Sequence, residues 1–79
     1  IPRRSIVTSE VAEDGSVKRW KLNLCAGDQN ELFDLSSDPD EMINLYNHDH
    51  YRDRVRIMAA KLRLWQHETG DSAPLPSVQ

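Results

Sequence analysis

Few residues of this 79-residue chain combine a reactive side chain with a useful neighbour. Cys25 is the only cysteine, and a reactive thiol needs a positive, partly exposed setting with a base close by. It stands at the end of a predicted strand with no evident base, so we interpret it as a structural thiol. Without a second cysteine no intrachain disulfide forms, and the fold must hold by packing alone.

Metal binding is the next chemistry that the residue types could support. His48, Asp49 and His50 carry ligand side chains, but their spacing matches no standard site, and His67 lies far along the chain. An acid at the start of a helix compensates the helix dipole, and this is the simpler interpretation of Asp49.

A run of acids in the middle of the chain raises the question of calcium: Asp34, Asp38, Asp40 and Glu41. An EF-hand loop requires an oxygen ligand where Met42 stands and a glycine where Ile43 stands. Capping of a helical turn explains these acids better. We therefore predict no catalytic, cofactor-binding or metal-binding residue in this chain.

The charges are segregated along the chain, although the formal net charge is only −3. Residues 26–50 contain seven acids and no Lys or Arg. Residues 51–65 contain one acid and five cations: Arg52, Arg54, Arg56, Lys61 and Arg63. These cations spread around the predicted helix without interleaved aromatic residues, so we predict no nucleic-acid partner. No apolar run approaches the roughly 20 residues that span a bilayer, so we predict no membrane partner either.

Three strands are predicted from alternation and turn signals. Residues 5–11 are rich in β-branched side chains and precede Asp14-Gly15, a strong hairpin signal. Residues 17–25 alternate cleanly, with Trp20, Leu22 and Leu24 on one face and polar side chains on the other. A polar loop over residues 26–30 then leads to a third strand over residues 31–35.

A short helical turn is predicted after the third strand. Asp38 is its expected cap, Pro39 its first helical residue and Glu41 the carboxylate that reaches back to the cap. Apolar residues of this turn are expected to tuck onto the sheet: Met42, Ile43 and Leu45.

A longer helix is expected from about Asp49 to just before Gly70, which suits a left-handed helix end. Its apolar stripe falls within a sector of about 80° at 100° per residue, and comprises Tyr51, Val55, Met58, Leu62 and Trp65. Ile57 and Leu64 lie about 100° away from this stripe. They indicate a second contact surface.

The expected fold class is α+β, a small antiparallel sheet of three strands, with a fourth left open, packed by one C-terminal amphipathic helix. A chain of this length buries only about 60% of the surface that it exposes when unfolded, so we assign one domain, residues 1–70. Residues 71–79 contain two prolines and no periodicity, which predicts an extended or disordered tail. Since the chain begins with Ile1 and shows no signal peptide, we expect it to be part of a longer protein.

Three blocks between Arg19 and Leu45 carry a resemblance to a known family: Arg19-Trp20-Lys21-Leu22, Glu31-Leu32-Phe33-Asp34-Leu35 and Asp38-Pro39-x-Glu41-x-x-Asn44-Leu45. Together they resemble the C-terminal subdomain of the sulfatase family, which commonly reads Tyr-Lys-Leu, Glu-Leu-Tyr-Asp-Leu and Asp-Pro-x-Glu-x-x-Asn-Leu before a helix that ends near a Trp. Trp20 and Phe33 stand where tyrosines are usual. The resemblance covers nearly the whole chain except the tail, and its distinctive block is a structural signature, not a catalytic one.

The resemblance implies a subdomain that packs in cis on a large α/β catalytic domain of the alkaline-phosphatase type. That domain would hydrolyse sulfate esters with calcium and a formylglycine made from the first residue of a Cys/Ser-x-Pro-x-Arg motif. The motif is absent here, because Gly27 and Gln29 stand where Pro and Arg would follow Cys25. Formylglycine and calcium are therefore expected only in the catalytic domain, and a secreted or periplasmic location is expected if the parent is a typical sulfatase.

Two sets of residues are candidates for the contact with that catalytic domain: the apolar pair Ile57 and Leu64, and the basic face Arg52, Arg56 and Arg63. The subdomain would also shape the rim of the substrate cleft. An isolated fragment whose apolar flank is uncovered is expected to self-associate.

Two alternatives stay open. The chain is either an independent interaction module whose basic helix binds an acidic partner, or the same subdomain from a related phosphonate or phosphate ester hydrolase. The first alternative predicts a well-folded monomer whose binding weakens with salt.

Overall fold

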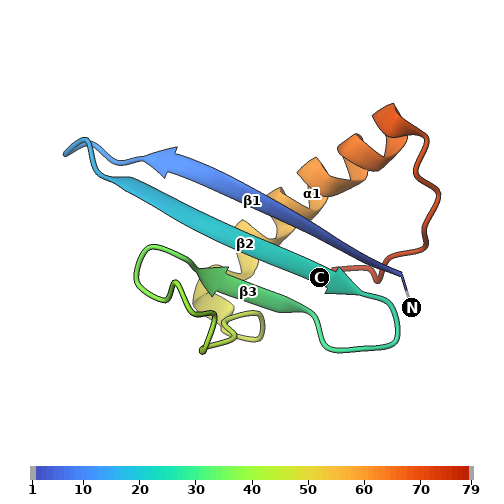
Figure 1. The fold of residues 1–79 in the computed structure, drawn as a ribbon, viewed down its shortest axis with the longest axis horizontal. Coiled ribbons are helices and arrows are strands. Elements are labelled where there is room, and N and C mark those ends of the chain that lie inside the picture. The colour runs from blue at the N-terminus through green and yellow to red at the C-terminus, as the bar shows by residue number, and fades with distance from the viewer. Residues whose placement is uncertain (1, 79) are drawn as a thin grey trace.

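One helix lies across one face of a three-stranded antiparallel sheet (Figure 1). In this computed structural model, which describes residues 2–78, strands β1 (Arg3–Val11), β2 (Val17–Cys25) and β3 (Glu31–Asp34) are adjacent in chain order. After a long loop, a 3₁₀ turn η1 (Asp49–Tyr51) leads directly into helix α1 (Arg52–Thr69). The α+β prediction is confirmed, with three strands between residues 2 and 78.

The hairpin between β1 and β2 has the predicted turn. Its register runs from Val11 opposite Val17 to Arg3 opposite Cys25, and Gly15 adopts a φ of +84° in the loop. Such a φ is easy for glycine and costly for other residues, which explains why Asp14-Gly15 marks the turn correctly. Strand β1 starts two residues earlier than predicted, and β3 ends one residue earlier.

The core fills the space between the sheet and α1. Its buried sheet residues are Trp20, Leu22, Leu24 and Leu32, and its buried helix residues are Val55, Met58, Ala59 and Leu62. The alternation in β2 and the helical stripe therefore identified most of the core. Trp65, which was placed in the stripe, lies at its margin and keeps 47% of its surface exposed.

The predicted helical turn after the third strand is wrong, because residues 38–45 contain no helix. The Asp38 carboxylate does accept two amides, from Met42 N and Ile43 N at 2.9 Å each. Glu41, however, has a left-handed φ of +56°, which stops a right-handed helix from continuing. Its carboxylate accepts from Lys21 Nζ at 3.1 Å, away from the expected cap position. Met42 and Ile43 are exposed and do not tuck onto the sheet.

Asn44 closes the outer edge of β3. Its Oδ1 accepts from Leu32 N at 3.0 Å, and its Nδ2 donates to Asn30 O at 3.0 Å. The next residue continues the contact, since Leu45 N donates to Leu32 O at 2.8 Å. Backbone groups at a sheet edge need such partners, and here the Asn44 side chain and the Leu45 amide supply them for Leu32.

Residues 71–78 contain no helix or strand and run back from the end of α1 toward the first residues of β1 (Figure 1). Gly70 adopts the predicted left-handed conformation, with φ of +71°. The Asp71 carboxylate then accepts from Arg4 Nε at 2.6 Å and Arg4 Nη2 at 2.9 Å. Further along, Leu75 and Val78 pack against the core.

Candidate functional site

The predicted apolar contact residues, Ile57 and Leu64, are both exposed on α1, at 59% and 57% of their surface. They are seven residues apart, so they lie nearly on one line along the helix. Ile57 also lines a pocket that α1 forms with the β1–β2 hairpin. The apolar row therefore starts at the rim of that pocket.

The predicted basic face lies elsewhere on the helix, about 100° around it from the apolar pair. Each arginine contacts its own chain: Arg52 pairs with Asp49 at 2.6 Å, Arg56 with Asp53 at 3.6 Å, and Arg63 Nη2 donates to Pro76 O at 3.1 Å. The structure thus separates the five candidate residues into an apolar flank on one side of α1 and a basic flank beside the C-terminal segment.

Trp65 extends the apolar flank toward the sheet. It borders a shallow groove of about 250 Å³ along β1, together with Ile6, Val7 and Leu62. Sequence reasoning assigned Trp65 wholly to the core, although its position at the end of the 80° sector was a signal that it could reach the surface.

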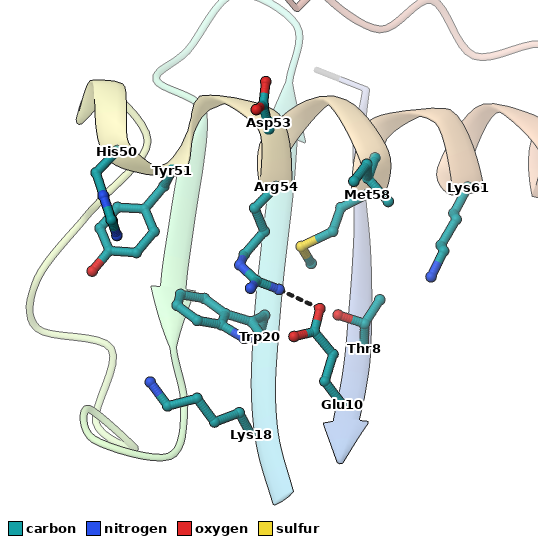
Figure 2. Close-up of a pocket in the computed structure, with 11 residues that line it drawn as sticks. Thr8, Glu10, Lys18, Trp20, His50, Tyr51, Asp53, Arg54, Met58 and Lys61 are labelled. Atoms are coloured by element: carbon teal, nitrogen blue, oxygen red, sulfur yellow. Dashed lines mark hydrogen bonds and ion pairs between the residues drawn. The ribbon is translucent and has the colours of Figure 1, made fainter. Parts of the chain in front are cut away.

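Figure 2 shows a larger pocket, of about 450 Å³, between the N-terminal half of α1 and the outer half of the β1–β2 hairpin. Trp20 stands at its centre and is 3% exposed. The Arg54 guanidinium stacks on the indole, with its carbon 4.1 Å from the ring centroid, and Lys18 Nζ lies 5.3 Å from the same centroid. Tyr51 packs against the indole at a centroid distance of 5.6 Å.

Cations outnumber acids around this pocket. The Glu10 carboxylate accepts from Arg54, and this hydrogen bond holds the pKa of Glu10 below its ordinary value. Lys18 pairs with Asp34 at 3.3 Å. Lys61 has no ion pair among residues 2–78, and its side chain extends toward the sheet (Figure 2). Asp53, also at the pocket rim, points away from the sheet.

Two residues that line the pocket each have a buried polar atom with no hydrogen-bond partner in the part of the chain that the structure describes: Trp20 Nε1 and Thr8 Oγ1. Thr8 and Trp20 are directly opposite each other in the β1–β2 register. Sequence reasoning did not single out this pocket. The hairpin turn alone would have placed Thr8 beside Trp20 and Glu10 beside Lys18, whereas the stacking of Arg54 required the position of α1.

The remaining candidates for chemistry lie apart. Cys25 is buried at the end of β2. His48 and His50 both lie against Tyr51, at centroid distances of 6.2 and 4.9 Å, and Asp49 pairs with Arg52. In the described part of the chain, no three His, Cys, Asp or Glu side chains gather in a way that could hold a metal ion.

No helix between residues 2 and 78 has the length and apolar character needed to cross a membrane. Comparison with protein-family models, curated proteins and solved structures finds no match for this chain.

Proposed function

We propose that this chain is the C-terminal subdomain of a sulfatase, a non-catalytic module that packs on the catalytic domain and contributes to the rim of its substrate cleft. The observation that carries the proposal is the set of backbone hydrogen bonds that residues 38–45 make. Asp38 holds two amides, Asn44 closes the edge of β3, and Leu45 bonds to Leu32. The resemblance rests on this block, and a block in which Asp38, Asn44 and Leu45 hold backbone in place fits a structural signature.

The apolar flank supports a packing role. Ile57, Leu64 and Trp65 lie within about 100° of one another around α1, and each is about half exposed. Burial of apolar surface contributes about 25 cal/mol per Å², so a domain that covered this flank would gain stability from it. Scattered exposed apolar residues are ordinary, but residues gathered on one flank mark an interaction surface.

The basic flank supports the alternative interaction module less well. Arg52 and Arg56 each have an acid three residues earlier in the chain, and Arg63 is bonded to a carbonyl. Their positive field is therefore partly neutralised within the chain. An adaptor that recognised an acidic partner would be better served by arginines free of such contacts.

All bond-breaking chemistry is assigned by this proposal to the catalytic domain, which would hold the formylglycine and calcium. The first test is to sequence the reading frame upstream of Ile1. A Cys/Ser-x-Pro-x-Arg motif and a paired Asp-Asp near its start would support the proposal, whereas a start codon directly before Ile1 would overturn it.

Activity assays of the full-length protein then separate the two hydrolase classes. A sulfatase should hydrolyse an aryl sulfate faster than the matching aryl phosphate or phosphonate. The opposite order would place the subdomain in a phosphonate or phosphate ester hydrolase. Activity on none of these esters by a correctly folded, metal-loaded protein would contradict both.

A further inference from the structure

The indole N–H of Trp20 is a buried donor without a hydrogen-bond acceptor in the described part of the chain, which is unusual. Only 3% of the residue's surface is exposed, yet Nε1 has no acceptor among residues 2–78. Nearly all buried donors in folded proteins have a partner. An indole nitrogen can only donate, so the absent partner must be a hydrogen-bond acceptor.

A second buried polar atom belongs to the residue opposite Trp20 in the hairpin. Thr8 Oγ1, directly across the hairpin from Trp20, also lacks a partner within the described residues, and a hydroxyl can donate to the same acceptor. Both residues line the pocket of about 450 Å³. Two paired residues of neighbouring strands, each with such an atom, thus line one cavity.

The charges around the cavity favour a negatively charged acceptor. Arg54 and Lys61 both line it, and the only carboxylate that Figure 2 shows beside the indole belongs to Glu10, which Arg54 already binds. Lys61 is without an ion pair among residues 2–78. The cavity therefore offers a free cation, a guanidinium and two uncharged hydrogen-bonding groups.

We propose that this pocket binds an oxyanion group, such as a sulfate, phosphate or carboxylate, through Lys61 and Arg54, and that Trp20 Nε1 and Thr8 Oγ1 donate to it once the Arg54 side chain that covers the indole shifts. Its volume falls within the roughly 300–1,000 Å³ of small-molecule sites, so the oxyanion can carry an organic group. Tyr51, Ile57 and Met58 supply apolar wall for that group. The proposal goes beyond the packing role and does not depend on it.

The test uses the two tryptophans of the chain, because each gives one indole N–H signal in a ¹⁵N-correlated NMR spectrum. Trp20 reports on the pocket, and the half-exposed Trp65 serves as the internal reference. The protein is titrated with sodium sulfate, sodium phosphate, sodium acetate and, as the control, sodium chloride at equal ionic strength. We expect a saturable shift of the Trp20 signal with at least one oxyanion, little change at Trp65, and no saturable shift with chloride.

Matched variants separate binding from a general charge effect. Lys61→Gln should weaken binding about fivefold, and Arg63→Gln, which removes one charge from the basic flank, should leave it within about twofold. Glu10→Gln removes the competing carboxylate and should strengthen binding about threefold. Comparison of the sulfate, phosphate and acetate curves shows which oxyanion the pocket prefers.

Three results would overturn the proposal. The first is an equal response to chloride, and the second is equal weakening by Lys61→Gln and Arg63→Gln. The third is a Trp20 signal that no oxyanion moves, which would mean that water alone partners the indole. The upstream reading frame has no influence on these measurements, so this proposal and the proposed function can fail separately.

Discussion

A single carboxylate, that of Asp71, joins three parts of the molecule. It accepts two hydrogen bonds from Arg4 of β1, one from Gln66 of α1 at 3.3 Å, and one from Ala73 N at 3.2 Å. A paired, two-point contact between a guanidinium and a carboxylate is the strongest form of such a pair. The hydrogen bond from Arg4 is the main reason that the pKa of Asp71 falls to about 2.

This pKa predicts a stability change at acid pH. Because the folded pKa of about 2 lies below the ordinary 3.8, the contribution of Asp71 is fully present above about pH 4 and is lost as the pH falls to 2. Asp71→Asn should therefore be less stable than the parent at pH 5, and the difference should vanish near pH 2. Thermal unfolding followed by circular dichroism between pH 5 and pH 2 measures it.

The control for this experiment is Asp53→Asn, whose carboxylate is 91% exposed and pairs weakly with Arg56. Its difference from the parent should stay small at every pH. A pH-independent difference for Asp71→Asn would show that its carboxylate has no acid-sensitive role.

The C-terminal end of α1 depends on the backbone conformation of one residue, Gly70. Gly70 has a φ of +71°, and a Cβ added there would meet no heavy atom within 4 Å. The cost of a side chain is therefore conformational and not steric. Gly70→Ala should destabilise the fold by about 1 kcal/mol, measured by urea unfolding.

Gly70→Asn is the matched comparison for this change. Asparagine tolerates the left-handed conformation better than alanine does, so its loss of stability should be smaller. Equal losses for the two variants would mean that the left-handed conformation is not what limits this position.

The elements that the sequence predicted correctly are those with local signals. Asp14-Gly15 indicated the hairpin, alternation indicated β2, and Gly70 marked the helix end. The segment from Asp38 to Leu45 could not be predicted in this way. Its conformation depends on contacts far along the chain, from Asn44 to Leu32 and from Glu41 to Lys21, which favour the observed path over a helical turn.

Likewise, one part of the pocket could be predicted from the sequence and the other could not. Its floor, Thr8 beside Trp20, follows from the hairpin register and was accessible to sequence reasoning. The side formed by α1 could not be predicted, because Arg54 reaches the indole only when α1 is placed across the sheet. The apolar pair Ile57 and Leu64 was predictable from helical spacing, but its separation from the basic flank depends on where the C-terminal segment runs.

The whole molecule presents an uncovered apolar flank on α1. We expect the isolated chain to self-associate through it, and Ile57→Glu/Leu64→Glu to shift the chain toward the monomer, because charges on the flank oppose burial. Sedimentation velocity over a range of concentrations measures the effect.

Arg56→Ala/Arg63→Ala is the control pair. It has the same seven-residue spacing and lowers the net charge by the same two units at exposed positions of the basic flank. Equal dissociation by both pairs would assign the effect to net charge and contradict the assignment of the flank.

The unequal length of the strands has a further consequence. Strand β3 pairs only with Trp20–Asn23, so the tip of the hairpin, from Val11 to Val17, is a two-stranded ribbon with every residue exposed. Such a segment opens locally at a lower free energy than the whole fold. Glu10 and Lys18, which flank the pocket, are the next pair inward. One wall of the pocket therefore belongs to the part of the sheet whose amide hydrogens exchange first, while the wall formed by α1 stays closed.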